Sequence, residues 1–236
     1  MEPYLQLNWP ETPKLVDKGN NGGGGYGSQY KEGYCGQSHP NAAYAGMISR
    51  MDQSIGRILD KLDELQPTNN TLVLFSSDNG PSPEGGQDVE FFDSNGPLSG
   101  GKRSMKEGGI RVPMIARWPG RIEPGTVSGH PGAFWDFLPT ACDVADIEPP
   151  RNIDGISFLP ELLGRPEAQR KHEYFYWIWA VRVGRWKLHP AGKDKFRLYD
   201  LENDLAEQHD LARKFPDVVA RCSKYFEIAG KRKETQ

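Results

Sequence analysis

The chain has 236 residues, of which 36% are hydrophobic and 26% are charged, and its formal net charge is −3 at pH 7. This length is enough for one sizeable hydrophobic core, or for a core with a small additional domain. The nearly balanced charge gives no reason to expect a nucleic acid or an anionic membrane surface as partner. No apolar run approaches the length of a transmembrane helix. The composition therefore predicts a globular protein with many loops.

Residues 1–40 are predicted to be an irregular, Gly-rich N-terminal segment. The stretch 20–28 reads Asn-Asn-Gly-Gly-Gly-Gly-Tyr-Gly-Ser, which is typical of a flexible loop. A phosphate-binding glycine loop is the alternative, but no Gly-Lys-Ser/Thr follows and no strand precedes it. The first eight residues lack the basic start and apolar region of a signal peptide.

Residues 41–65 show the periodicity of an amphipathic helix. Apolar residues recur at spacings of three and four, which predicts one apolar face that packs in the core. These residues are Met47, Ile48, Met51, Ile55, Ile58, Leu59 and Leu62.

The run Leu72-Val73-Leu74-Phe75 leads directly into Ser77-Asp78-Asn79-Gly80. Four consecutive apolar residues before a polar pair predict a parallel strand, buried on both faces, that ends at an active site. Asp78 and Asn79 offer hard oxygen atoms, which suit Ca²⁺ or Mg²⁺ better than zinc. Since Asp-Asn-Gly is also good turn chemistry, a plain turn is the alternative.

A second polar series begins at Gly100 and ends at Pro113. The flexible Gly100-Gly101 pair allows close backbone approach, so that Lys102 can project as a point charge for an oxyanion. A surface lysine is the alternative. Glu107 and Arg111 are expected to form an internal ion pair that supports this loop, with substrate binding as the alternative. Residues 112–120 then predict another core strand closed by a turn.

The later part of the chain changes character at about residue 173. Before it, a helix is predicted over 133–147, and the α/β part, with the helix and strands above, is assigned to 41–170. After it, the segments 174–179, 180–183, 186–189 and 196–199 alternate and are rich in aromatics, which predicts short antiparallel strands. A last helix is expected over 216–228. Residues 171–236 are therefore predicted to form a small C-terminal α+β subdomain.

A series of motifs runs in order along the chain. The motifs are Ser77-Asp78-Asn79-Gly80, Gly101-Lys102, Glu107-Gly108-Gly109-Ile110-Arg111-Val112-Pro113, Trp118-Pro119-Gly120, Asp136-Phe137-Leu138-Pro139-Thr140, Asp154-Gly155-Ile156-Ser157-Phe158-Leu159-Pro160 and Leu198-Tyr199-Asp200-Leu201. Taken together and in this order, they resemble those of the sulfatases of the alkaline-phosphatase superfamily, especially the bacterial arylsulfatase branch. The resemblance covers nearly the whole chain from about Asn41 onward. It implies an α/β fold, with a partial alkaline-phosphatase-like mixed sheet flanked by helices, followed by a small C-terminal antiparallel sheet with a helix.

The resemblance implies calcium-dependent hydrolysis of a sulfate ester. In the family a hydrated formylglycine attacks sulfur and the alcohol leaves. Asp78 and Asn79 match the family's second pair of metal ligands, for Ca²⁺ or else Mg²⁺, and Lys102 matches the catalytic lysine that contacts the sulfate and the leaving-group oxygen. The implied substrate is a sulfated small molecule or glycan. Full-length relatives are commonly periplasmic or secreted, whereas the location and oligomeric state of this chain are not predicted.

The sequence departs from the family in one respect, because it contains no Cys/Ser-x-Pro/Ala-x-Arg motif, from which formylglycine is made. The contexts of Cys35, Cys142 and Cys222 do not fit the motif, nor does any serine. All three cysteines are expected to be free structural thiols. The chain is therefore interpreted as the C-terminal portion of a sulfatase, with little activity alone. A phosphatase or phosphodiesterase of the same superfamily, or a non-catalytic remnant that binds metal or anions, remains an alternative.

The five histidines show no clear metal-ligand spacing. Structural roles are predicted for all of them, with His172, His189 and His209 in surface turns.

Overall fold

The computed structural model describes residues 2–10, 39–193 and 195–233. The chain forms two compact units, each built from several segments. Unit 1 comprises Met1–Leu65, Ser77–Val112 and Asp204–Gln208, and unit 2 comprises Gln66–Ser76, Pro113–Asn203 and His209–Gln236. The predicted Gly-rich loop at 20–28, and Cys35, lie outside the described residues.

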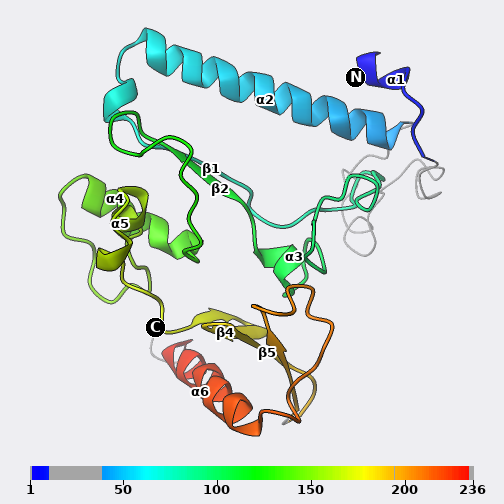
Figure 1. Ribbon diagram of the computed structural model, residues 1–236, viewed down its shortest axis with the longest axis vertical. Coiled ribbons are helices and arrows are strands. Elements are labelled where there is room, and N and C mark those ends of the chain that lie inside the picture. Colours follow the sequence, from blue (N-terminus) through cyan, green and yellow to red (C-terminus); the bar gives the residue numbers. More distant parts are fainter. Residues whose placement is uncertain (1, 11–38, 194, 234–236) are drawn as a thin grey trace. The chain divides into compact units, whose positions relative to one another are not determined.

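Unit 1 contains the helices α1 (Glu2–Leu5), α2 (Pro40–Glu64) and α3 (Glu107–Ile110). Helix α2 confirms the long helix expected over 41–65. Its first turn is buried, and α1 lies beside it (Figure 1), where the hydroxyl groups of Tyr4 and Ser49 share a hydrogen bond.

The apolar stripe of α2 is not buried as predicted. Met47 is 68% exposed and Ile58 is 60% exposed, and Ile48 and Met51 are exposed as well. The periodicity correctly identified one apolar face, but periodicity alone does not determine what covers that face. In the described part of the chain, only the residues of the first turn, Pro40 to Ala43, are buried in this helix.

Unit 2 begins with η2 (Thr68–Asn70) and a two-stranded sheet made of β1 (Val73–Ser76) and β2 (Met114–Arg117). Both strands were expected, but their pairing is antiparallel, with Val73 opposite Arg117. The prediction of a parallel strand buried on both faces is therefore wrong. An apolar run indicates burial but not the direction of the neighbouring strand, and in this two-stranded sheet Ile115 is 63% exposed.

Short helical elements follow β2. They are η3 (Phe134–Asp136), α4 (Phe137–Val144), α5 (Leu159–Leu162) and η4 (Pro166–Ala168). The helix predicted over 133–147 occurs as η3 and α4. The carboxylate of Asp136 ties this region together, because it accepts hydrogen bonds of 2.8 Å from the backbone N–H groups of Ala133 and Ile156.

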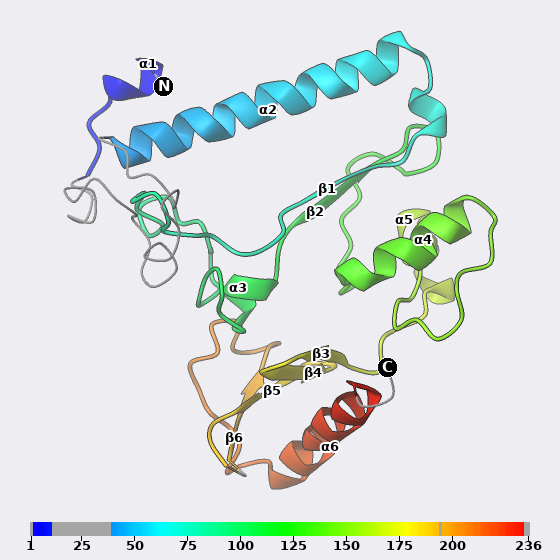
Figure 2. The same cartoon turned by 180° about the vertical axis from the view of Figure 1, so that it is seen from behind.

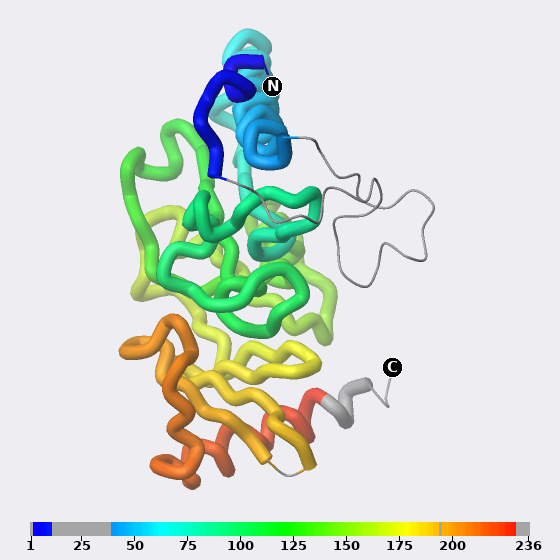
Figure 3. The backbone as a smooth tube through the Cα atoms, turned by 90° about the vertical axis from the view of Figure 1, so that its right-hand side faces the viewer, coloured from blue at the N-terminus to red at the C-terminus, as the bar shows by residue number. Residues whose placement is uncertain are grey.

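The C-terminal part of unit 2 is an antiparallel sheet of β3 (Phe175–Trp177), β4 (Ala180–Val183), β5 (Trp186–Pro190) and β6 (Phe196–Asp200), in that order. Helix α6 (Pro216–Lys233) packs against one face of the sheet (Figures 2 and 3). Its core contains Leu188, Leu198 and Cys222, all fully buried. The small antiparallel sheet with one helix is confirmed, and the fold is mixed α/β as expected.

Of the helices within the described ranges, none combines the length and the apolarity that crossing a bilayer requires.

Candidate functional site

The candidate site is built in unit 1, where the chain continues beyond β1. Asp78 is exposed, Asn79 is half-buried and Gly80 is buried. The hydroxyl of Ser77 donates a 2.8 Å hydrogen bond to the carbonyl oxygen of Asn79. This local bond fixes the turn, so the two oxygen-bearing side chains leave the backbone at adjacent positions.

A backbone contact holds this turn against helix α3. The N–H group of Gly80 donates to the carbonyl of Gly109 at 3.0 Å. A Cβ atom at Gly80 would lie 1.8 Å from the carbonyl oxygen of Gly108. Because no side chain fits in that space, the close approach depends on glycine.

The Lys102 loop is fastened to the same turn. The backbone N–H of Lys102 donates to the carbonyl of Pro81 at 2.8 Å. A Cβ atom at Gly101 would lie only 2.7 Å from that same oxygen, and Gly100 has a φ of +84°. The structure therefore brings the backbone of the Lys102 loop against the segment that directly follows Asp78 and Asn79.

The side chain of Lys102 contacts an acid that the sequence did not single out. Its Nζ lies 2.9 Å from Oε2 of Glu84, and the guanidinium of Arg103 contacts the other carboxylate oxygen. The Glu84 side chain is 4% exposed and that of Lys102 is 25% exposed. The available signal was an acid in the segment Pro81-Ser82-Pro83-Glu84-Gly85-Gly86, which follows the Asp-Asn-Gly turn.

Two further acids, Glu107 and Glu207, make contacts at the C-terminal end of the Lys102 loop. The predicted ion pair of Glu107 with Arg111 is present at 3.9 Å, but it is internal only on the side of Glu107, whose side chain is 2% exposed, whereas that of Arg111 is 52% exposed. The backbone N–H of Glu107 also donates a 2.6 Å hydrogen bond to Oε2 of Glu207, which is buried. Glu207 lies a hundred residues away in sequence, so no local pattern could have indicated this contact.

The oxygen atoms of the side chains that follow β1 are of the kind that a hard cation prefers, but they are too few to fill its coordination shell. Asp78 and Asn79 provide carboxylate and amide oxygens, whereas Ca²⁺ usually takes six to eight oxygen ligands. Within residues 2–10, 39–193 and 195–233, no three His, Cys, Asp or Glu side chains are grouped as a metal site would need. Asp78 and Asn79 alone would therefore account for only part of such a ligand shell.

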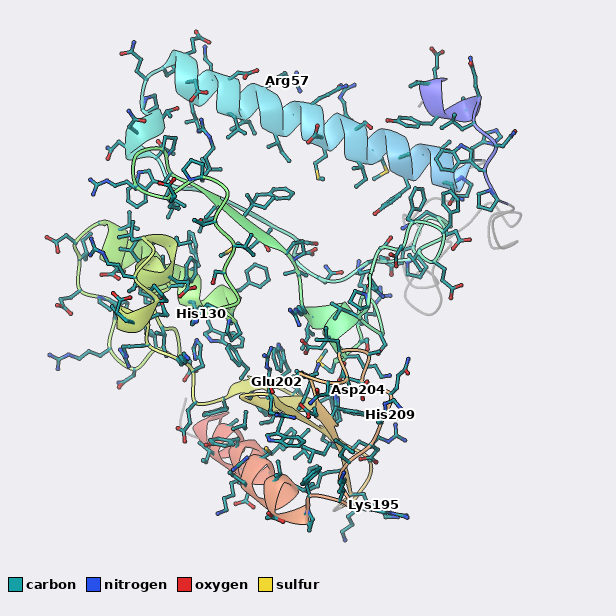
Figure 4. The ribbon with its side chains drawn as sticks, viewed as in Figure 1. Arg57, His130, Lys195, Glu202, Asp204 and His209 are labelled. Atoms are coloured by element: carbon teal, nitrogen blue, oxygen red, sulfur yellow. The ribbon has the colours of Figure 1, made fainter. Side chains whose placement is uncertain are left out.

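Two histidines of unit 2, His130 and His172, lie near acidic side chains. The His172 side chain is 7% exposed and its Nε2 lies 2.8 Å from the Asp136 carboxylate, so its predicted place at the surface is wrong. Burial lowers the pKa of His130, labelled in Figure 4, while the negative charges of Glu161 and Asp136 oppose this shift. Their contacts are those of a packed structural cluster.

Comparison with protein families agrees with these motifs. Residues 14–147 match the family model described as "Sulfatase". Residues 100–226 match the model described as "N-sulphoglucosamine sulphohydrolase, C-terminal". The first match covers more than half of the chain, and the chain belongs to the sulfatase family.

Curated relatives are similar over the same region. N-acetylgalactosamine-6-sulfatase of Canis lupus familiaris is 39% identical over 155 residues, which are 62% of this chain and 28% of the relative. Steryl-sulfatase of Mus musculus is 40% identical over 149 residues, which are 61% of this chain and 23% of the relative. The chain thus spans about a quarter of the length of the curated relatives it matches.

Solved structures show the same fold. The structure named Ps i-CgsB matches with a TM-score of 0.67 and 26% identity, over 81% of this chain and 43% of that one. A second, described as BT4656 in complex with its substrate D-glucosamine-2-N,6-O-disulfate, matches with a TM-score of 0.61 and 25% identity, over 80% of this chain and 40% of that one. The neighbours are sulfatases with the alkaline-phosphatase-like fold.

Proposed function

We propose that this chain forms part of the active site of a sulfuric ester hydrolase that acts on a sulfated glycan. The observation that carries the proposal is the backbone clamp in unit 1, which fastens the Lys102 loop to the turn of Asp78 and Asn79 through Pro81 and Gly80. A sulfate group that is bound by both a cation and a lysine needs the oxygen ligands of the cation and the ammonium group to be held close together.

Each residue has a distinct task in this proposal. The ammonium group of Lys102 donates hydrogen bonds to a sulfate oxygen and to the ester oxygen that leaves. When the sulfur–oxygen bond breaks, negative charge develops on that ester oxygen, and Lys102 stabilises it or gives it a proton. Asp78 and Asn79 would hold Ca²⁺, or alternatively Mg²⁺. The bound cation would supply positive charge beside the sulfate oxygens.

The nucleophile is the missing element. Because the 236 residues contain no Cys/Ser-x-Pro/Ala-x-Arg motif, we propose that this chain alone has little hydrolytic activity. A sugar substrate is favoured over a sterol by the solved neighbours, of which one is in complex with D-glucosamine-2-N,6-O-disulfate and another with k-i-k-neocarrahexaose.

Binding and turnover of a matched pair of esters test this function. An aryl sulfate and the phosphate of the same alcohol are titrated into the purified chain with Ca²⁺, and hydrolysis is followed in the same samples. We expect the sulfate to bind more tightly, Lys102→Met to weaken its binding about tenfold, and turnover of both esters to be negligible. Tighter binding or faster hydrolysis of the phosphate would favour a phosphatase or phosphodiesterase. If neither ester binds, the proposed site is contradicted.

A further inference from the structure

We infer that Glu84 is a positioning residue of this site: its buried carboxylate fixes the ammonium group of Lys102 in the place from which it contacts a sulfate ester. This inference rests on the proposed function, because it concerns how the proposed sulfate-binding lysine is held. Glu84 belongs to the loop that follows the Asp78-Asn79 turn, and Lys102 belongs to the loop clamped against that turn.

The burial of Glu84 is the first step of the argument. Its side chain is 4% exposed, and an ionised carboxylate removed from water is costly unless cations and hydrogen bonds compensate. Two cations do so here: Lys102 Nζ lies 2.9 Å from Oε2, and the Arg103 guanidinium contacts Oε1. Glu84 therefore binds two adjacent cationic side chains, one through each oxygen.

The carboxylate is itself held by its own loop. The hydroxyl of Ser82 lies 3.1 Å from Oε2 of Glu84 and donates to it, and the backbone N–H of Glu84 donates back to that hydroxyl at 3.1 Å. The side-chain amide of Gln87 donates to the carbonyl of Ser82. Pro81 and Pro83 restrict the same segment. Contacts within its own loop thus hold the Glu84 carboxylate in place.

A lysine side chain needs such an anchor. Fixing its four-carbon chain in one conformation costs rotamer entropy. The ion pair with Glu84 offsets this entropy loss within the folded protein, so that sulfate binding does not have to compensate for it. An ammonium group carries three N–H donors, so a bond to Glu84 is compatible with a second bond to an oxyanion.

Two explanations of Glu84 predict changes of opposite sign. If Glu84 were only a nearby negative charge, its neutralisation would strengthen the binding of a dianion such as inorganic sulfate. If Glu84 positions Lys102, neutralisation loosens the lysine and weakens sulfate binding despite the favourable change in charge. The direction of the change therefore separates positioning from simple electrostatics.

The experiment is a titration of inorganic sulfate into the wild-type chain and into Glu84→Gln, Glu84→Asp and Glu90→Gln. Glu90 is an exposed acid in the same unit, so Glu90→Gln removes an equal charge without touching Lys102. We expect binding to weaken about fivefold in Glu84→Gln and by less in Glu84→Asp, and to stay equal or tighten slightly in Glu90→Gln. Equal or tighter binding by Glu84→Gln would overturn the inference.

A second measurement does not depend on sulfate. Limited acetylation followed by mass spectrometry gives the reaction rate of Lys102, with Lys61, whose side chain is 57% exposed, as the internal reference. We expect the relative rate of Lys102 to rise about fivefold in Glu84→Gln while the far-UV circular dichroism spectrum is unchanged. An unchanged rate in a folded variant would also overturn the inference.

Failure of the inference can be told apart from failure of the proposed function. If Lys102→Met binds sulfate as the wild type does, or the wild type does not bind it at all, the proposed function is contradicted, and the acetylation rate still decides whether Glu84 holds Lys102. If Lys102→Met weakens binding and Glu84→Gln does not, only the role of Glu84 is overturned.

Discussion

Gly80 and Gly108 approach so closely that a Cβ atom on Gly80 would lie 1.8 Å from the carbonyl oxygen of Gly108. Gly80 ends the turn of Asp78 and Asn79, and Gly108 lies in α3, at the end of the loop that carries Lys102. Next to this contact, the N–H group of Gly80 donates a hydrogen bond to the carbonyl of Gly109. The distance between the two halves of the site is therefore set by backbone packing.

The first prediction concerns this contact. In Gly80→Ala the added Cβ would push the backbone at position 80 away from that of Gly108. We therefore expect the free energy of unfolding, measured by urea denaturation, to fall by about 2–3 kcal/mol. The matched control is Gly56→Ala in helix α2, where an added Cβ meets no atom within 4 Å. That change should leave stability equal or raise it by up to about 1 kcal/mol. Wild-type stability in Gly80→Ala would refute the close contact.

The second prediction concerns Asp136, which is 1% exposed. Its carboxylate accepts hydrogen bonds from the N–H groups of Ala133 and Ile156 and contacts the His172 ring. Asp136→Asn would turn an amide NH₂ toward these donors, so we expect a loss of about 2–4 kcal/mol in the free energy of unfolding. Glu148→Gln, at an exposed acid beyond α4, is the control and should change stability by less than about 0.5 kcal/mol. Equal effects of the two substitutions would show that the Asp136 contacts contribute little.

Elements with a local signature were predictable from the sequence. The aromatic, alternating segments gave four short strands, and the spacing of three and four gave α2, because both patterns depend only on neighbouring residues. The direction of the β1–β2 pairing and the exposure of Met47 and Ile115 were not predictable in this way. They depend on which segments lie next to each apolar surface, and a single strand or helix does not encode its neighbours.

The same distinction applies to the site. Asp78 and Asn79 could be selected because they come at the end of an apolar strand, and Lys102 because it follows a glycine pair. Glu84 was missed although it lies only a few residues beyond Asn79, because its importance comes from the ion pair with Lys102. Glu207 was missed because its contact with Glu107 joins distant parts of the chain.

The third prediction concerns Tyr225, whose hydroxyl donates a 2.6 Å hydrogen bond to Oε1 of Glu173. This bond, with a smaller effect of burial, raises the pKa of Tyr225 from 10.0 to about 12. Since the folded value is the higher one, the folded state keeps the proton longer. The contribution to stability is present below pH 10 and is lost as the pH rises toward 12.

The titration of Tyr225 can be followed by NMR of ¹³C-labelled tyrosine rings, with the signal assigned through Tyr225→Phe. In Glu173→Gln we expect the pKa of Tyr225 to fall toward 10. A Tyr225 signal that titrates near pH 10 in the wild type would contradict the hydrogen bond.

The fourth prediction compares two cysteines. Cys222 is a residue of α6 and is fully buried in the core with Leu188 and Leu198, and burial raises the pKa of its thiol. Cys142 is a free thiol whose residue is half-buried. Because only the thiolate is a good nucleophile, iodoacetamide at pH 8 should modify Cys142 at least about tenfold faster than Cys222. Peptide mass spectrometry measures both rates in one sample, and faster modification of Cys222 would contradict its place in the core.

The most direct test of the account is a calcium titration of the purified chain, monitored by isothermal calorimetry. Asp78 and Asn79 are proposed to hold the cation beside Lys102, so Asp78→Ala should weaken Ca²⁺ binding at least about tenfold. Glu90→Ala, which removes an exposed carboxylate from the same unit, should leave binding unchanged. Equal calcium affinity of the wild type and Asp78→Ala would contradict the proposed site.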